Sequence, residues 1–281
     1  MPKVAIVTDS TADLPEELYV QNNITVVPLS VIFGEEVYID NRQDLTVDRF
    51  FEKLKSSSKL PTTAQPTPAD FIKVYRKLME DNDNILSIHI SKKMSGTTDS
   101  AETAKKEIGS SSITVIDSEL TTIALGLIIL KASQMAKAGC SIEEIVSKVK
   151  DLKTSMNTLF IPHTLEYLQK GGRIGRAKGL IASLLEIKPI LTLHLGEVSQ
   201  YRTTRRWNQA KNEMLSSMQS MIKGNGNLYL SVADADLEEE GNEMTEKIKQ
   251  MFKPAFVLRS KIGCIVGTHL GPAIAIAFYE E

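Results

Sequence analysis

Cysteine is scarce in this sequence of 281 residues, which contains only Cys140 and Cys264, far apart and without a CxxC pair. This scarcity argues against a disulfide framework and against the usual cysteine spacings of zinc sites. Two free thiols suit a reducing compartment, so we expect a cytoplasmic protein. The segment from Met1 to Val7 lacks the long apolar stretch of a secretory signal, which agrees with that expectation.

An excess of either charge is also missing, because 33 Lys and Arg residues oppose 35 Asp and Glu residues and give a net charge of −2. Bulk attraction to nucleic acid or to an anionic membrane is therefore not expected, and any basic patch must be local. No long apolar run is present either. The longest run, residues 124–130, is too short to span a bilayer and predicts a buried helix.

Strand-like and helix-like segments alternate through the first half of the chain. Short apolar runs occur at residues 3–7, 24–29, 85–90 and 113–116. Such alternation predicts a parallel sheet with helices on both faces. After residue 155 hairpins and βα units are mixed. We therefore predict an α/β fold with two domains, a parallel Rossmann-like sheet domain over 1–155 and a mixed α/β domain over 156–281.

A polar loop from Ser91 to Thr98 separates the strand predicted at 85–90 from a helix that begins near Ser100. In open α/β sheets, ligands bind beyond the carboxyl ends of the strands, near helix N-termini. The hydroxyls and free N–H groups of this loop suit an anion such as a phosphate or a carboxylate. Taken alone, however, the loop is explained as well by Ser95 or Thr97 capping the helix.

Two aspartates, Asp9 and Asp13, follow the first predicted strand. They could hold a metal, but such residues more often shape a turn or cap a helix. We predict that Asp13 is the N-cap of the next helix, with Pro15 near its first position.

The segment from Pro61 to Pro68 is a constrained loop, since it contains three prolines that fix φ and lower the entropy of the chain. The start of the following helix accounts for Thr67 and Pro68 but not for Thr62 and Thr63. A rigid loop that carries hydroxyls suits ligand binding.

Five motifs in this order resemble those of the DegV family. They are Asp9–Leu14, Pro61–Pro66, Met94–Thr97, Leu165–Ile174 and Gly267–Pro272. Each motif is weak alone, but the set spans nearly the whole chain. The sequence departs from the family pattern at Ala64, where serine is usual, at Leu270, where threonine is usual, and at Ala273, where glycine is common.

The resemblance implies a two-domain α/β protein that holds a long-chain fatty acid between its domains, without a cofactor or a metal. Bacterial members serve as non-catalytic, fatty-acid-binding subunits of a fatty acid kinase. A separate kinase subunit phosphorylates the bound acid, and the acyl phosphate is carried toward phospholipid synthesis. By this resemblance Thr63, Ser95 and His269 grip the carboxylate, with Thr62 as a second candidate in the same turn.

The chemistry of these residues agrees with that role. A buried carboxylate must be hydrogen-bonded, and hydroxyls with an imidazole can do this without a permanent cation. Chain burial contributes roughly 0.8 kcal/mol per CH₂, on the order of 10 kcal/mol for a C16 chain before the costs of binding. Candidates for the tunnel wall, each equally suited to core packing, are Phe160, Ile161, Leu165, Leu168, Ile190 and Leu193.

An alternative function is a serine esterase or acyltransferase with Ser95 as nucleophile and His269 as base. Against it, the sequence around Ser95 lacks the Gly-x-Ser-x-Gly elbow, and no acidic residue near His269 is identifiable as its partner. A nucleotide-binding module ranks last, because the glycine cluster at 171–175 follows a helix and no P-loop is present.

Basic residues form two clusters, at residues 173–178 and 202–206. A solvated surface explains both clusters. The functional alternative is docking onto an acidic kinase surface or offsetting the charge of an acyl phosphate, with Arg173 and Arg202 as the most important residues. The glycine-rich segment that leads to Leu185 is a candidate lid, or alternatively an element that touches a membrane surface transiently. We assign structural roles to His89, His163, His194 and Trp207.

Overall fold

The computed structural model describes residues 3–183 and 187–281. The first half of the chain forms a parallel four-stranded sheet with the order β2-β1-β6-β7. Its strands are β1 (Val4–Asp9), β2 (Ile24–Val27), β6 (Asn84–His89) and β7 (Ile113–Asp117). The predicted parallel sheet is thus confirmed.

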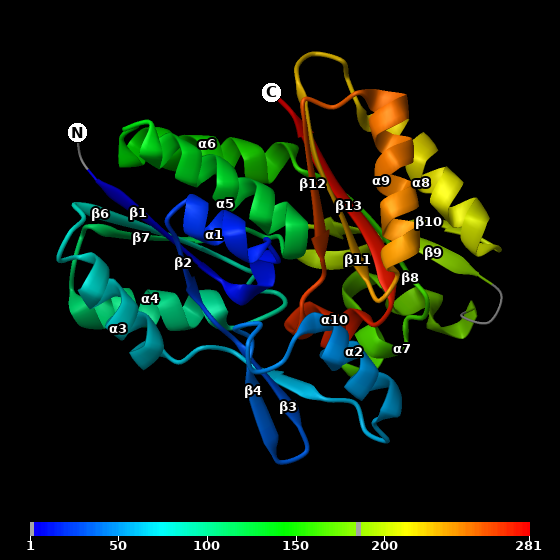
Figure 1. Cartoon of the computed structure of the whole chain (residues 1–281), viewed down its shortest axis with the longest axis horizontal. Helices are drawn as coiled ribbons and strands as arrows, with labels where there is room; N and C mark the ends of the chain where they lie inside the picture. Colours follow the sequence, from blue (N-terminus) through cyan, green and yellow to red (C-terminus); the bar gives the residue numbers. More distant parts are fainter. Residues whose placement is uncertain (1–2, 184–186) are drawn as a thin grey trace.

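Helices cover both faces of this sheet, which explains why its strands are almost continuously apolar. On one face lie α1 (Glu16–Gln21), α5 (Thr122–Lys137) and α6 (Ile142–Ser155), and on the other lie α3 (Pro68–Leu78) and α4 (Thr97–Ile108) (Figure 1). The helix predicted from the apolar run at 124–130 is α5, which is buried along most of its length.

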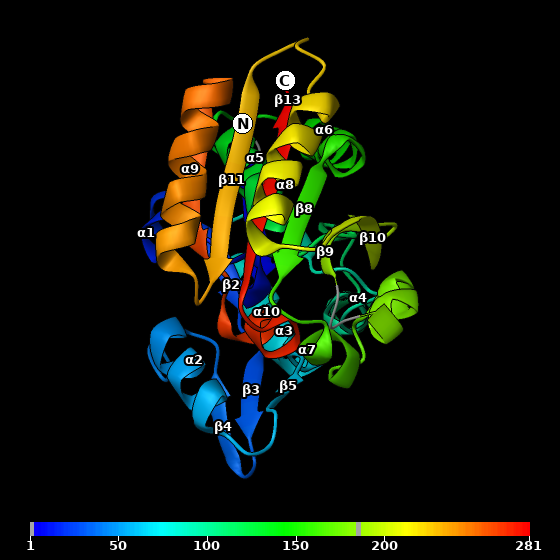
Figure 2. The ribbon, with the colours of Figure 1, turned by 90° about the vertical axis from the view of Figure 1, so that its right-hand side faces the viewer.

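The second half of the chain forms a mixed six-stranded sheet with the order β10-β9-β8-β13-β11-β12. Its strands are β8 (Asn157–Pro162), β9 (Lys188–His194), β10 (Glu197–Thr204), β11 (Leu228–Ala235), β12 (Phe256–Lys261) and β13 (Ala273–Glu280). Helices α8 (Trp207–Met221) and α9 (Glu238–Phe252) lie side by side over one face (Figure 2). Helices α5 and α6 contact the opposite face, so they lie between the two sheets.

A single buried hydrophobic cluster includes residues of both sheets and of the helix between them, for example Leu86, Leu127 and Ala275. The mixed sheet begins at Asn157, next to the boundary predicted from the sequence. The division into domains 1–155 and 156–281 itself stays a prediction.

A small third sheet, β4-β3-β5, projects below the others in Figure 1. It contains β3 (Ser30–Phe33), β4 (Glu36–Ile39) and β5 (Thr62–Ala64). The proline-rich segment is therefore not only a loop, because it contributes β5, which pairs with β3 and sets Thr63 opposite Val31. The remaining elements are η1 (Ser10–Ala12), α2 (Val47–Ser56), α7 (Glu166–Lys170), η2 (Gly175–Ser183) and α10 (Cys264–Leu270).

The structure corrects the predicted role of Asp13 as a helix N-cap. Helix α1 begins at Glu16, and the residue before it, Pro15, makes no side-chain cap. Asp13 instead adopts a left-handed backbone conformation, and its Oδ1 accepts a hydrogen bond of 2.9 Å from the N–H of Gly263, just before α10. The carboxylate thus caps a helix that lies 250 residues away in the chain.

Two other boundaries differ from prediction. The sequence from Arg202 to about Ile222 predicts a helix. In the structure that helix begins only at Trp207, because β10 continues through Thr204 in its pairing with β9. The sequence from Gly179 to Leu185 also predicts a helix. The structure has a 3₁₀ segment there, η2, which ends at Ser183, and the rest of that prediction lies outside the described residues.

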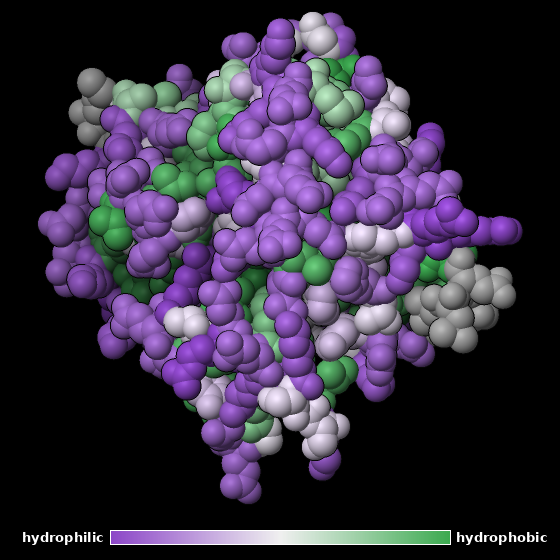
Figure 3. Space-filling view, turned by 45° about the vertical axis from the view of Figure 1, so that its right-hand side comes forward, coloured by the Kyte–Doolittle hydropathy of each residue, from purple (hydrophilic) through white to green (hydrophobic). Residues whose placement is uncertain are grey.

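The face of the molecule in Figure 3 is largely hydrophilic, with small and separate hydrophobic patches. Within the described part of the chain, none of the helices has both the length and the apolar character that a bilayer crossing requires.

Candidate functional site

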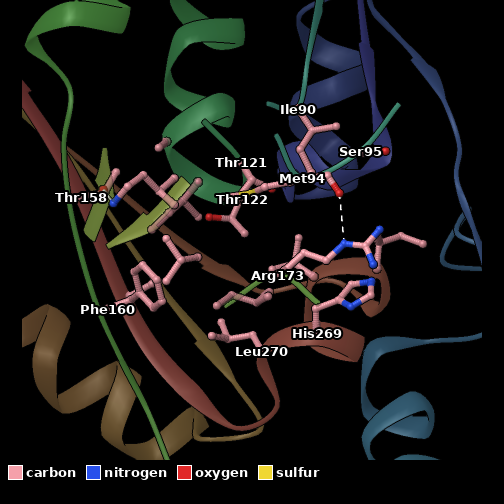
Figure 4. A pocket seen from close by; sticks show the side chains of 18 of the residues that line it. Ile90, Met94, Ser95, Thr121, Thr122, Thr158, Phe160, Arg173, His269 and Leu270 are labelled. Atoms are coloured by element: carbon pink, nitrogen blue, oxygen red, sulfur yellow. Dashed lines mark hydrogen bonds between the residues drawn. The ribbon is translucent and has the colours of Figure 1, made fainter. Parts of the chain in front are cut away.

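A cavity lies between the two sheets and is lined by residues from both halves of the chain (Figure 4). It encloses about 960 Å³ of space free of atoms, counting the part that opens to solvent. The wall is mainly apolar. A smaller set of polar side chains, including Thr63, Ser95 and His269, lines it as well.

Thr63 and His269 meet at this cavity from opposite ends of the chain. Thr63 lies on β5 and His269 near the end of α10, and Thr63 Oγ1 is 2.9 Å from His269 Nε2. Thr62 is exposed and does not line the cavity, because neighbouring side chains on a strand point to opposite faces. The structure thus brings Thr63, but not Thr62, to His269.

His269 is held in a tight and largely buried setting. A Cβ at Gly171 would lie 2.3 Å from His269 Nδ1, so only glycine leaves room for the ring. Within the described residues, Nδ1 is buried and has no hydrogen-bond partner. Burial, and then the nearby charge of Arg173, lower the pKa of His269 to about 4. The imidazole is therefore neutral at pH 7.

Ser95 lies in the loop that precedes α4 and lines the same cavity. Its Oγ is 2.8 Å from Thr97 Oγ1 and accepts a bond of 3.3 Å from the N–H of Thr97. The N-cap position itself belongs to Gly96, which has no side chain to cap the helix. Ser95 thus satisfies an N–H group of the first turn of α4 and also lines the cavity. Its role in anion binding stays a prediction.

Ser95 and His269 do not form a nucleophile–base pair in this structure. Ser95 Oγ bonds within its own loop, whereas His269 Nε2 bonds Thr63. Among the residues described, no hydrogen bond links Ser95 to His269. The arrangement therefore lacks the contact that activates a serine.

Arg173 lies in the cavity wall beside His269 (Figure 4). Its Nε donates to the carbonyl oxygen of Met94 at 3.2 Å, and its Nη1 donates to that of Gly171 at 2.6 Å. From the sequence we gave Arg173 a role in partner docking or in offsetting acyl-phosphate charge, but its place in the cavity wall was missed. The family signature that ends in Gly171-Gly172-Arg173-Ile174 was the signal that could have found it.

Arg202, the other predicted docking residue, lies outside the cavity. It is exposed on β10 and forms an ion pair with Glu213. Its guanidinium carbon lies over the Tyr201 ring, 5.5 Å from the ring centre. The structure therefore separates the two arginines that the sequence analysis grouped.

Half of the predicted tunnel residues line the cavity. Phe160, Leu168 and Leu193 do so, whereas Ile161 and Ile190 face the opposite side of the mixed sheet and pack in the cluster under α8 and α9. The sixth candidate, Leu165, is buried in the main core and does not line the cavity. Sequence reasoning missed Gln65, Thr121, Thr122 and Thr158, which also line it.

The remaining histidines have structural surroundings or lie on the surface. Tyr75, Ser87, His89 and Asp9 form a buried chain of hydrogen bonds, with Ser87 Oγ 2.6 Å from His89 Nε2 and His89 Nδ1 3.0 Å from Asp9 Oδ2. The order resembles a catalytic triad, but Ser87, His89 and Asp9 are fully buried in the core, so no substrate reaches them.

The predicted packing role of Trp207 is also confirmed. Its ring lies edge-on to His163 at 4.3 Å, and its Nε1 donates to Glu240. His194, in contrast, is exposed. In the described ranges, no group of three or more His, Cys, Asp or Glu side chains is arranged to hold a metal ion.

The fold and the cavity define a class, the α/β proteins that enclose a largely apolar cavity between a parallel and a mixed sheet. The chain belongs to the DegV family, because a family model described as "Uncharacterised protein, DegV family" matches residues 3–281. The resemblance seen in the sequence is thus confirmed.

Relatives and solved structures agree over the full length. A DegV domain-containing protein of Clostridium perfringens is 35% identical over 283 residues, which cover 100% of this chain and 99% of that protein. The solved structure of a fatty-acid-binding DegV family protein from Thermus thermophilus has a TM-score of 0.95 and 32% identity, and the match covers 99% of this chain and 100% of that one. A stearic acid-binding protein from Eubacterium ventriosum has a TM-score of 0.90 and 28% identity, with 100% of this chain and 98% of that chain covered.

Proposed function

We propose that this protein binds a long-chain fatty acid in the cavity, with the carboxylate held by Thr63, Ser95 and His269. The observation that carries the proposal is the Thr63–His269 hydrogen bond in the wall of a mainly apolar cavity. The fatty-acid-binding relatives from Thermus thermophilus and Eubacterium ventriosum support the class of ligand. Thr62 is left out of the grip, because its side chain is exposed and does not line the cavity.

The hydrogen bonds of such a site can be assigned by donor and acceptor. A neutral imidazole has one N–H group. With the proton on Nε2, His269 donates to Thr63 Oγ1, which leaves the hydroxyl proton of Thr63 free for one carboxylate oxygen. The hydroxyl of Ser95 donates to the other oxygen. Both oxygens are then satisfied, as a buried carboxylate requires.

Arg173 contributes charge to this site without gripping the acid directly. Two of its N–H groups hold the carbonyl groups of Met94 and Gly171, so its guanidinium is fixed beside the cavity. A positive charge placed there favours the carboxylate over the neutral acid. It also offsets part of the charge that an acyl phosphate would add.

We further propose that the protein acts as a non-catalytic carrier in the cytoplasm. It presents the carboxylate to a separate, ATP-using fatty acid kinase subunit, and the resulting acyl phosphate feeds phospholipid synthesis. The missing contact between Ser95 and His269 supports a carrier over an esterase. Arg202 is exposed and suited to an acidic partner surface, whereas Arg173 would connect that surface to the site.

Mass spectrometry of lipid extracted from the purified protein tests the binding role. We expect about one long-chain fatty acid per chain. The carrier role is tested by adding a fatty acid kinase subunit and ATP, and acyl phosphate should form only when all components are present. Protein that contains no acid and takes up none would overturn the proposal. Hydrolysis of a fatty acyl ester that Ser95→Ala abolishes would favour the esterase instead.

A further inference from the structure

The start of helix α5 opens onto the cavity. Four consecutive residues, Thr121 to Ala124, line the cavity wall. A helix that presents its side contributes residues three or four apart, so a consecutive run means that the end of the helix faces the cavity. Figure 4 shows Thr121 and Thr122 between Thr158 on one side and Arg173 with His269 on the other.

Several hydrogen-bond donors at this helix end have no partner among the described residues. Thr121 holds the N-cap position, but its side chain makes no capping bond. Thr121 is 7% exposed, and its Oγ1 is buried without a partner among the described residues. In the same part of the chain, no acceptor is found for the backbone N–H groups of Thr122, Ile123 and Ala124. Buried polar groups are rarely left in this state.

The backbone at this point is strained. Thr122 has a φ of +51°, a left-handed conformation that is an outlier for a β-branched residue. The surroundings fix the strained turn, because Ser91 N–H bonds the carbonyl of Leu120 and Ser118 N–H bonds that of His89. Strain of this kind persists where the surrounding structure over-determines the backbone, and it gathers at ligand sites.

A particular ligand group fits these donors. The N–H groups at the start of a 16-residue helix, together with its dipole, favour an oxygen that accepts hydrogen bonds. The Thr121 hydroxyl can accept a hydrogen bond as well as donate one. An alcohol can make both kinds of hydrogen bond. Its oxygen accepts from the N–H groups of the helix, and its O–H group donates to Thr121 Oγ1. A plain hydrocarbon chain makes neither.

We infer that the start of α5 is a second polar subsite, which takes a hydroxyl group carried partway along the acyl chain. This inference rests on the proposed function, because the chain reaches α5 only if the acid occupies the cavity. The protein then takes hydroxylated long-chain fatty acids as ligands, in addition to plain ones. Thr121 is the residue that sets this specificity.

The test compares stearic acid with monohydroxystearic acids whose hydroxyl stands at successive mid-chain positions. Each acid is titrated into the full-length protein after its lipid has been removed. In a wholly apolar tunnel a hydroxyl loses its hydrogen bonds to water. The affinity of every hydroxylated isomer would then be lower than that of stearic acid by a factor of roughly ten or more. We expect at least one isomer to bind as tightly as stearic acid or more tightly, and the others to bind more weakly.

The variant Thr121→Val removes the hydroxyl and keeps the shape of the side chain. It should weaken binding of the favoured isomer about tenfold more than it weakens binding of stearic acid. Thr8→Val is the matched control, because Thr8 on β1 also carries a buried hydroxyl without a described partner but does not line the cavity. The control should leave the affinities for both acids, and so the preference, unchanged.

The outcomes separate the inference from the proposed function. If stearic acid binds but every hydroxylated isomer binds roughly tenfold more weakly, only the inference is overturned. The same holds if Thr121→Val and Thr8→Val have equal effects. If neither kind of acid binds, the proposed function falls together with the inference. A crystal structure of the favoured complex should place the ligand hydroxyl within hydrogen-bond distance of Thr121 Oγ1 or of the first N–H groups of α5.

Discussion

At the scale of single residues, the neighbours Thr62 and Thr63 provide a matched pair. Only Thr63 bonds His269 and lines the cavity. Thr63→Val should lower the affinity for a long-chain fatty acid about tenfold, because one carboxylate oxygen loses its donor. Thr62→Val makes the same change on the exposed side of β5 and should have no effect. Titration of both delipidated variants checks this, and equal losses of affinity would remove Thr63 from the site.

The titration of His269 should be visible in the pH dependence of stability. Its pKa is about 4 in the folded protein, mainly because the ring is buried, and about 6.5 when unfolded. The unfolded chain therefore binds more protons between these values. The stability that the neutral ring contributes is complete above pH 6.5 and is lost as the pH falls toward 4, by on the order of 3 kcal/mol.

A variant without the titrating group isolates this effect. Asp40, whose pKa burial raises to about 6, shifts stability in the opposite direction over the same range. That contribution cancels when the wild type is compared with His269→Gln. Urea unfolding at pH 4.5 and pH 7 should show a larger loss on acidification for the wild type. Identical losses for the two proteins would mean that the ring is not held neutral by burial.

At the scale of elements, α10 depends on a residue from the other half of the chain. Asp13 accepts the N–H of Gly263 at the start of this helix, and the helix carries His269. Asp13→Ala leaves that N–H buried without an acceptor, which should cost about 1–3 kcal/mol of stability and weaken fatty acid binding. Asp13→Asn should cost less, because burial already raises the pKa of Asp13 and the amide oxygen still accepts. Similar losses in both variants, measured by urea unfolding, would contradict this role.

Elements defined by local patterns could be predicted, whereas those defined by distant partners could not. The strands of the parallel sheet stand out as apolar runs. Helix α6 begins at a capping box of Ser141 and Glu144, and the sequence Ser-Ile-Glu-Glu predicts this start. In contrast, β5 exists because it pairs with β3, and prolines on both sides hide it. Helix α10 has only seven residues, and the N–H of its N-cap residue, Gly263, is bound by Asp13. A short helix capped from afar leaves no sequence signal.

At the scale of the whole molecule, the site joins segments that no local pattern connects. Thr63, Ser95, Arg173 and His269 come from four separate parts of the chain. Three of them, Thr63, Ser95 and His269, could be predicted as carboxylate-binding residues only from the ordered family motifs. The place of Arg173 and the open end of α5 depend on how the two sheets pack against each other, and one sequence does not show this packing.

A ligand held between the two sheets should stabilise the whole molecule as one unit. The cavity is lined by α5 and by strands of the mixed sheet, so a bound acid contacts both halves of the core. At a free fatty acid concentration of 100 times Kd, the delipidated protein should gain about 2.7 kcal/mol in the free energy of unfolding. Thermal unfolding should remain a single transition that moves to higher temperature. Thr63→Val at the same concentration should gain less, and Thr62→Val should match the wild type. Two separate transitions, of which only one responds to the acid, would show that the halves unfold independently and that the ligand does not join them.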